Sequence, residues 1–328
     1  MIYTVSANPA LDLTLTVPAI EFESVLRATG VRRAWAGKGF NVSRFLKKLG
    51  MENVAFAFAA GHTGRALAEG LHALGIQTHF VMVDGETRTN VVIEEPDGHH
   101  IKVNQPGAAV TGADIATFQA QVRAVAAPGD VWVLTGSLAP GMPVDFYAEL
   151  ARILHTAGAQ VVLDTSGAAL RAGMAGRPEF VKPNTVEATE YLSAPVTSIE
   201  AAVAAARAFQ RGGADRVVLS MGKEGAVAGD ATGCWQVIPP TIQARTGVSA
   251  GDALVAGSVL ALRRGLQMPE IARWGVAVGT LAAMRDDLPP DPWPELNELF
   301  ERVQGDTTGL NLFQHIEKAV MQIARKTK

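Results

Sequence analysis

The strongest chemical signal in the 328-residue chain lies at residues 246–257, where small residues precede an acid, Asp252, and an apolar stretch follows it. Its second half has a strongly helical pattern, so Ser249, Ala250 and Gly251 should form the entry of a helix, where free backbone N–H groups and the helix dipole create an anion site. Asp252 beside such a site is a candidate general base, which would accept a proton from a hydroxyl while the N–H groups stabilise a transferring phosphate. An Asp in a first helical turn also interacts favourably with the dipole without any chemistry, and that alternative stays open.

A second stretch, residues 36–44, reads Ala-Gly-Lys-Gly-Phe-Asn-Val-Ser-Arg and leads into a helix predicted over residues 42–49. It offers backbone N–H groups together with the cation of Lys38 and the amide of Asn41. The spacing is not that of a P-loop, which needs a four-residue spacer before Gly-Lys-Ser/Thr, and the third glycine of a dinucleotide fingerprint is absent. A flexible loop with an N-cap at Asn41 is the alternative.

Two further stretches combine polar residues with the end of an apolar run. Asn184 and Glu187 would face the same way on a helix starting there, so they could hold water around a magnesium ion. They could equally be an N-cap and its matching acid. Residues 217–226 read as a strand and a glycine turn, which either lets a nucleotide lie along the backbone or forms an ordinary hairpin.

The elements that must position these residues follow an alternating rhythm. Short apolar runs alternate with stretches whose apolar residues recur every three or four positions, which predicts strands separated by helices and a parallel sheet covered on both faces. The predicted strands include residues 54–60, 131–135, 161–164 and 217–220, and the predicted helices include 144–156 and 199–211. Ligands bind at the carboxyl ends of such strands, so the polar turns there are candidate site walls.

Other segments break that rhythm. Residues 11–17 alternate apolar and polar, and residues 89–95 and 100–103 flank a Pro-Asp-Gly turn, so these segments predict a small sheet with one wet face. Such a sheet would serve as a lid or as a dimer contact. Residues 311–328 predict a final amphipathic helix with a basic end.

Composition excludes several classes of protein. With 48% hydrophobic and 19% charged residues the chain is not disordered, and 29 basic against 32 acidic side chains give a net charge of −3. That balance creates no field that would gather nucleic acid or an anionic membrane. Because no apolar run approaches the roughly 20 residues of a membrane span and the N-terminus lacks a signal-peptide pattern, we expect a cytoplasmic protein.

Seven motifs in this order resemble the phosphofructokinase-B branch of the ribokinase-like sugar kinases over about residues 1–290, most of all its 1-phosphofructokinase and tagatose-6-phosphate kinase groups. The motifs lie at residues 8–12, 37–42, 85–90, 135–141, 164–167, 182–184 and 250–252. The resemblance implies a three-layer α/β/α fold with a mostly parallel central sheet and a small β-sheet lid. It implies a kinase domain over residues 1–304, lid segments at about 11–35 and 87–104, and a C-terminal helical extension over 305–328.

The resemblance also implies an ATP- and Mg²⁺-dependent kinase that phosphorylates a sugar phosphate, first of all fructose 1-phosphate. A 6-phosphofructokinase, a tagatose-6-phosphate kinase and a non-catalytic nucleotide- or sugar-binding regulator are the alternatives. It implies a homodimer through the lid, and the charge balance predicts no nucleic acid or membrane partner.

The family pattern assigns a role to each matching position. Asp252 matches the catalytic base, and Ser249, Ala250 and Gly251 match the anion hole. The substrate positions are Asp12, Gly37, Lys38, Gly39, Asn41, Arg88, Asn90, Ser137 and Arg27, with Lys38, Arg88 and Arg27 as cations for the phosphate already on the sugar. The nucleotide positions are Lys182, Asn184, Ser220, Gly222, Gly225, Val276 and Gly279, and Glu187 matches the acid that holds magnesium through water.

The chain departs from the family pattern at three positions. Ser249 and Ala36 each replace the first glycine of a motif. The anion hole survives the serine if residue 249 need not adopt a positive φ. Val25 stands where the minor 6-phosphofructokinase has a substrate-binding lysine, which argues against that specificity.

Overall fold

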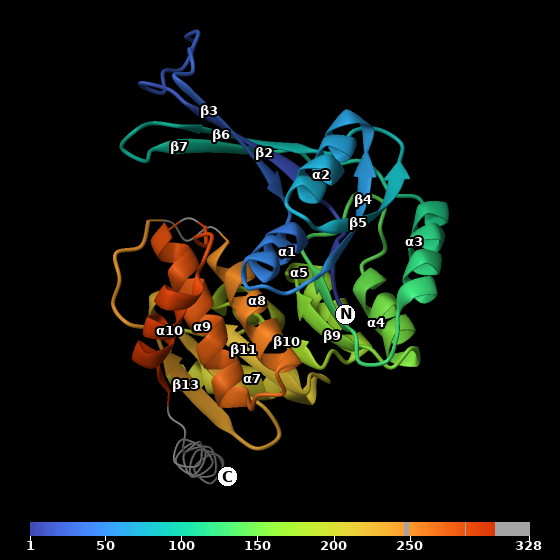
Figure 1. The fold of residues 1–328 in the computed structure, drawn as a ribbon, viewed down its shortest axis with the longest axis vertical. Coiled ribbons are helices and arrows are strands. Elements are labelled where there is room, and N and C mark those ends of the chain that lie inside the picture. The colour runs from blue at the N-terminus through green and yellow to red at the C-terminus, as the bar shows by residue number, and fades with distance from the viewer. Residues whose placement is uncertain (246–248, 286, 306–328) are drawn as a thin grey trace.

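Two β-sheets organise the chain in the computed structural model, which describes residues 1–245, 249–285 and 287–305. A large sheet forms the body, and a small sheet projects from one end of it (Figure 1). None of the described helices is long and apolar enough to cross a membrane.

The large sheet has ten strands among the described residues, in the order β14-β13-β12-β11-β10-β9-β8-β1-β4-β5. The pairs from β11 to β5 are parallel, whereas β12, β13 and β14 add antiparallel to one edge. The strands are β1 (Ile2–Ser6), β4 (Val54–Ala60), β5 (Gln77–Val83), β8 (Val131–Thr135), β9 (Gln160–Asp164), β10 (Phe180–Val181), β11 (Arg216–Ser220), β12 (Ala226–Gly229), β13 (Cys234–Ile238) and β14 (Gln304–Gly305). The predicted mostly parallel sheet is confirmed.

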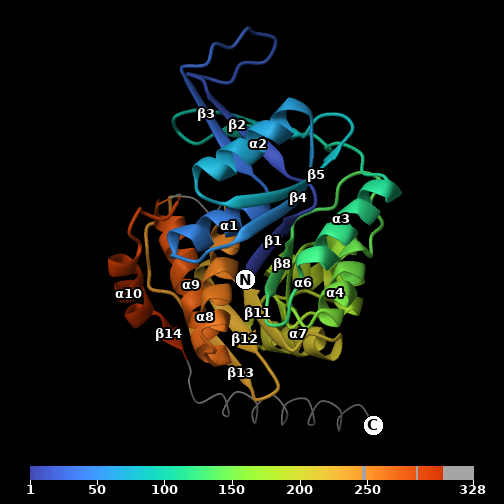
Figure 2. The same cartoon turned by 45° about the vertical axis from the view of Figure 1, so that its right-hand side comes forward.

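Helices cover both faces of this sheet (Figures 1 and 2). Apolar side chains of β4 alternate between the two faces: Phe56 and Phe58 join the core beneath one helical layer, and Ala55 and Ala57 face the other. One layer holds α1 (Lys38–Lys48), α2 (Gly61–Ala73), α8 (Ala250–Arg263), α9 (Met268–Arg285) and α10 (Trp293–Arg302). The other holds α3 (Gly112–Val125), α4 (Phe146–Thr156), α5 (Gly167–Gly173), α6 (Thr185–Leu192) and α7 (Ile199–Arg211). The predicted three-layer arrangement is therefore correct.

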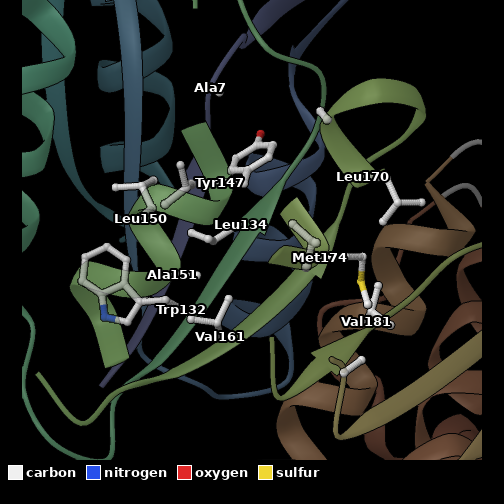
Figure 3. Packing of buried hydrophobic residues seen from close by; sticks show 14 of the residues in the cluster. Ala7, Trp132, Leu134, Tyr147, Leu150, Ala151, Val161, Leu170, Met174 and Val181 are labelled. Atoms are coloured by element: carbon white, nitrogen blue, oxygen red, sulfur yellow. The ribbon is translucent and has the colours of Figure 1, made fainter. Parts of the chain in front are cut away.

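The core beneath α4 shows why the predicted strand at 131–135 is so apolar. Trp132 and Leu134 of β8 point to the same side, where they pack with Tyr147 and Leu150 of α4 (Figure 3). Val131 and Val133 face the opposite side, in the core under α1 and α8. A strand buried on both faces needs apolar residues at every position, which removes the alternation typical of a surface strand.

The small sheet has the order β3-β2-β6-β7 and is formed by β2 (Ala10–Thr16), β3 (Gly30–Ala36), β6 (Thr89–Glu94) and β7 (His100–Asn104). The predicted hairpin of β6 and β7 and the predicted strand at 11–17 are confirmed. In both cartoons the loop between β2 and β3 extends beyond the ends of these strands, away from the body (Figures 1 and 2).

Two predictions need comment at the ends of elements. The helix predicted from residue 42 begins four residues earlier, at Lys38, with Gly37 as its N-cap residue. The helix predicted at 311–328 lies outside the described residues. The domain end predicted at 304 stays a prediction, and Gln304 and Gly305 on either side of that boundary both pair with β13 as strand β14.

Candidate active site

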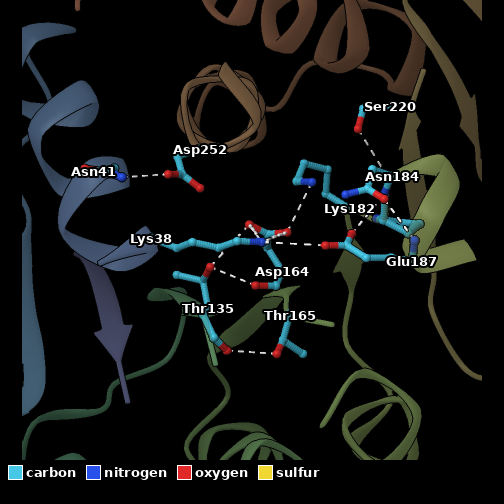
Figure 4. Close-up of polar contacts among 12 residues, drawn as sticks. Lys38, Asn41, Thr135, Asp164, Thr165, Lys182, Asn184, Glu187, Ser220 and Asp252 are labelled. Carbon is cyan, nitrogen blue, oxygen red and sulfur yellow. Dashed lines mark hydrogen bonds and ion pairs between the residues drawn. The ribbon is translucent and has the colours of Figure 1, made fainter. Parts of the chain in front are cut away.

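The start of α1 places an amide and a cation in one site. Gly37 has φ +133°, a conformation that favours glycine, and the helix begins directly after it. The alternative of an N-cap at Asn41 is wrong, because Asn41 lies in the first turn and its N–H donates to Gly37 O at 2.9 Å. The side chains of Lys38 and Asn41 therefore both reach the cluster shown in Figure 4.

Asp252 lies in the first turn of α8 and is buried, with 6% of its surface exposed. Asn41 Nδ2 donates to its Oδ2 at 2.8 Å and to Ser249 Oγ at 3.3 Å. Burial and the nearby charge of Asp164 raise the pKa of Asp252 to about 7, although the hydrogen bond from Asn41 and the two lysines nearby act in the opposite direction. A carboxyl group with such a pKa can exchange a proton near neutral pH, as a general base must.

Ser249 corrects one expectation about the anion hole. The residue has φ +64°, in the left-handed region, so it does take the positive φ that a glycine would adopt easily. A non-glycine residue there costs on the order of 1 kcal/mol. The chain tolerates this strain at the turn that leads directly into Ala250, Gly251 and Asp252.

Asp164 lies in the motif at residues 164–167, but the sequence assigned it no role. Its side chain is fully buried, and its Oδ1 lies 3.1 Å from Lys182 Nζ and 3.3 Å from Lys38 Nζ. Thr135 Oγ1 donates to Oδ2 at 3.2 Å. Burial alone would raise the pKa of Asp164, but the two ammonium groups together hold it below its ordinary value. The available signal was an acid at the carboxyl end of an apolar strand, where ligands bind in α/β sheets.

Lys38 joins this buried cluster. Its Nζ lies between Asp164 and Glu187, 3.8 Å from Glu187 Oε1 (Figure 4). Burial would lower the pKa of Lys38, but Asp164, Glu187 and Asp252 together raise it to about 12. In this structure the ammonium group thus lies with the carboxylates next to Lys182, and its role as a cation for a sugar phosphate stays a prediction.

Asn184 and Glu187 form the capping box that the sequence left as one alternative. Asn184 Oδ1 accepts from Glu187 N, and Glu187 Oε2 accepts from Asn184 N, both at 2.9 Å. The second oxygen, Oε1, faces Lys38. Capping therefore fixes the Glu187 side chain and leaves one carboxylate oxygen directed into the site. The capping box is thus compatible with the other alternative, a magnesium site, which stays a prediction.

Asp12, Arg88 and Asn90 meet at the base of the small sheet. Asp12 and Asn90 are neighbours across β2 and β6, and Asn90 Nδ2 donates to Asp12 Oδ1 at 2.8 Å. Arg88 Nη2 donates to Asn8 O at 2.9 Å, while its buried Nε–H has no hydrogen-bond partner in the part of the chain that the structure describes. Burial lowers the pKa of Arg88, partly offset by Asp12. The three side chains offer a carboxylate, an amide and a cation together.

Known proteins share much of this sequence and its fold. Residues 6–288 match the model of the pfkB family of carbohydrate kinases. The chain belongs to that family. It is similar to a 1-phosphofructokinase of Rhodobacter capsulatus, with 39% identity over 88% of this chain and 93% of that one. It is 32% identical to the ATP-dependent 6-phosphofructokinase isozyme 2 of Escherichia coli K12, over 86% of this chain and 92% of the relative. Its fold matches the tetrameric inhibited form of phosphofructokinase-2 from Escherichia coli, with a TM-score of 0.85, 30% identity and coverage of 92% and 98%.

The other predicted nucleotide positions of this pfkB kinase lie at the end of β11, on the turn after it and on α9. Ser220 ends β11 and bridges to Asn184, and a tight turn through Gly222 and Gly225 leads into the antiparallel β12. This stretch therefore forms a hairpin, and contact of its turn with a nucleotide stays a prediction. Val276 is buried, and Gly279 packs on the start of α8, since a Cβ there would lie 3.0 Å from Ala250 O. Their contact with a nucleotide stays a prediction.

Two predicted substrate residues of this pfkB kinase have exposed side chains and, among the described residues, no hydrogen bond or ion pair with the other predicted site residues. Arg27 is exposed in the loop between β2 and β3, which extends away from the body (Figure 2). Ser137 is exposed just after β8. Both stay predictions, and Arg27 could reach a sugar only if its loop folded back or a second copy of the chain approached it.

Proposed function

We propose that this pfkB kinase transfers the γ-phosphoryl group of ATP to a fructose phosphate, with the 6-hydroxyl of fructose 1-phosphate as its first acceptor. The observation that carries the proposal is Asp252, a buried carboxyl group with a pKa near 7 at the start of a helix, held by Asn41. The names of the 1-phosphofructokinase and 6-phosphofructokinase relatives support the substrate class.

The chain's own residues divide the chemistry among them. Asp252 would accept the proton of the attacking hydroxyl, and the backbone N–H groups at the start of α8 would stabilise charge on the transferred group. Lys182, buried beside Gly251, and Lys38 add two positive charges near the same point. Phosphoryl transfer needs mainly positioning and charge stabilisation, which this arrangement supplies.

The carboxylates near Lys38 fit a magnesium ion. The Lys38 ammonium lies between Asp164 and Glu187, and this supports a space between the two carboxylates that favours a cation. Carboxylate oxygens are also the ligands that Mg²⁺ prefers. Magnesium bound with ATP would neutralise phosphate charge during transfer. We propose that Glu187, through water, and Asp164 hold it.

At the other end of the acceptor, we propose that Arg88 binds the phosphate already on the sugar, and that Asp12 and Asn90 bind its hydroxyls. The Nε–H of Arg88 has no hydrogen-bond partner among the described residues, so it leaves a donor for an anion. Fructose 6-phosphate and tagatose 6-phosphate have a phosphate at a similar distance from a free hydroxyl, so they remain the alternative acceptors. Val25 argues against the first of these.

A coupled assay for ADP release tests the proposal. The purified protein is given ATP and magnesium with fructose 1-phosphate, fructose 6-phosphate, tagatose 6-phosphate and unphosphorylated fructose in turn. We expect the highest kcat/KM with fructose 1-phosphate. A higher kcat/KM with another sugar phosphate would change the proposed substrate. If no sugar causes ADP release, a non-catalytic binding protein is favoured.

A further inference from the structure

The acid of the motif at residues 85–90 has no part in the chemistry described above, yet it makes defined contacts. Glu86 Oε1 accepts a hydrogen bond from Thr63 N at 2.5 Å, and Oε2 accepts one from His62 N at 3.1 Å. Both donors belong to the first turn of α2, where N–H groups lack partners within the helix. The N-cap residue of α2 is Ala60, whose side chain cannot accept a hydrogen bond. A carboxylate from a distant segment therefore caps this helix.

The chain leaves room for that carboxylate. Gly61, the first residue of α2, has φ +62°, and a Cβ at this position would lie 1.8 Å from Glu86 Oε2. The next residue, Thr87, is buried and binds the same junction twice: its Oγ1 accepts from Ala60 N at 2.7 Å, and its N–H donates to Ala60 O at 3.1 Å. Residues 86 and 87 are thus both fixed to the junction between β4 and α2.

Arg88 follows directly in the chain. Its carbonyl accepts from Leu11 N at 2.9 Å, where β2 enters the small sheet, and its guanidinium donates to Asn8 O. The backbone that carries this side chain is therefore held on one side by α2 and on the other by β2. A second contact ties the small sheet to the same helix: a Cβ at Gly70 would lie 2.0 Å from Trp35 Nε1 of β3. The helix α2 is the support on which this end of the small sheet rests.

We infer that Glu86 is a positioning residue for the acceptor site: by capping α2 it fixes the backbone at Arg88 and so sets where the guanidinium meets the phosphate of the sugar. The inference rests on the proposed function, in which Arg88 binds that phosphate. In this inference Glu86 acts through the first turn of α2 and the backbone, and not through a contact with the sugar. A shift of Arg88 by a fraction of an ångström weakens a directional contact to one end of the acceptor and leaves the nucleotide side, around Lys182, unchanged.

The test compares two acids near the same helix. Glu86→Ala removes the cap, and Glu69→Ala, on the exposed side of α2, removes the same charge and serves as the matched control. We expect Glu86→Ala to raise KM for the sugar phosphate about tenfold and to leave KM for ATP within about twofold. Glu69→Ala should change neither constant. Glu86→Gln, which keeps one acceptor oxygen, should restore part of the loss.

A double-mutant cycle with Arg88→Ala separates this inference from the proposed function. If Arg88→Ala alone leaves the sugar KM unchanged, the proposed phosphate contact fails. If Arg88→Ala raises it but Glu86→Ala behaves as Glu69→Ala does, the positioning role is overturned. When Glu86 acts through Arg88, Glu86→Ala should add less than about twofold in the Arg88→Ala background, and fully additive effects would contradict the inference.

A structural role alone predicts a different pattern. Loss of the cap would then lower the melting temperature and raise both KM values together, which would also overturn the inference. Thr87→Val keeps the approximate shape of the buried side chain but leaves the buried Ala60 N–H without its acceptor, so its melting temperature is measured beside both KM values. We expect it to raise the sugar KM selectively as well.

Discussion

At the scale of single residues, the site depends on one carboxyl group whose environment conflicts with its charge. Asp252 is buried close to the charge of Asp164, and both effects favour the protonated form. Asn41 and the lysines offset only part of this. A residue with these properties is costly to the fold and useful to catalysis, because a base works best when its pKa lies near the working pH.

Asp252→Asn should lower kcat by about 10²–10⁴-fold with little change in KM for ATP, since an amide cannot accept the proton. With a pKa near 7, the wild-type kcat should rise with pH between about 6 and 8 and then level off, as the carboxylate form becomes complete. The variant should lack this rise. Steady-state kinetics across that pH range check both points, and near-normal turnover by the variant would remove Asp252 from its role as base.

The same substitution should stabilise the free protein at high pH. The pKa of Asp252 is raised from 3.8 to about 7, so between these values the folded state keeps a proton that the unfolded state has lost. The free energy of unfolding therefore falls as pH rises through this window, and the stability from this group is fully lost above it. Asparagine does not titrate. We expect Asp252→Asn to be more stable than wild type by about 1–3 kcal/mol at pH 8, and by clearly less at pH 5. Urea unfolding at both pH values measures this, and an equal difference at the two would contradict it.

At the scale of elements, α8 must be held firmly because its first turn carries Asp252. Its packing on α9 is close: a Cβ at Gly257 would lie 2.6 Å from Trp274 O and 2.8 Å from Val278 Cγ2. Both neighbours are parts of a packed helix and cannot move away cheaply. The glycine therefore sets the distance between these two helices.

Gly257→Ala should lower the free energy of unfolding by about 1–3 kcal/mol, although alanine forms helices better than glycine. Gly112→Ala is the matched control, because a Cβ at this position of α3 meets nothing within 4 Å. That variant should be stabilised by about 0.5–1 kcal/mol. Chemical denaturation of both proteins gives the comparison. If Gly257→Ala is as stable as Gly112→Ala, the close packing of α8 on α9 does not limit the fold.

Elements could be predicted where burial alone decides them. The strands at 54–60 and 131–135 have their predicted bounds, because apolar runs end at polar turns. The start of α1 could not be predicted, since glycine and lysine are weak signals there. It depends on long-range contacts such as Asn41 with Asp252, 211 residues apart. Likewise the position of Lys38 beside Asp164 follows from the order of strands in the sheet, which no local pattern contains.

At the scale of the whole molecule, the small sheet has two unlike faces. The pairing register places Leu13 and Leu15 of β2 on one face, together with Val91 and Ile93 of β6 and Val103 of β7. Val31 and Arg33 of β3 share this face, so at these positions it is apolar apart from one basic side chain. Asp12 and Asn90 lie on the opposite face. Val31 and Val103 are each 57% exposed, so the apolar face is open in the single chain. An exposed apolar face of this kind is typical of an interaction surface.

We propose that a second copy of the chain covers this face, which gives the homodimer that the sequence suggested. Val103→Glu places a charge on the apolar face. His100 lies three positions earlier on the same strand and faces the other side, so His100→Glu is the control. Light scattering should give about twice the 34.5 kDa chain mass for wild type and His100→Glu, and the chain mass for Val103→Glu.

If wild type has the chain mass at every concentration, or if Val103→Glu keeps the wild-type mass, the apolar face is not the dimer contact. If both variants dissociate, charge anywhere on β7 suffices, and the face itself does not determine assembly.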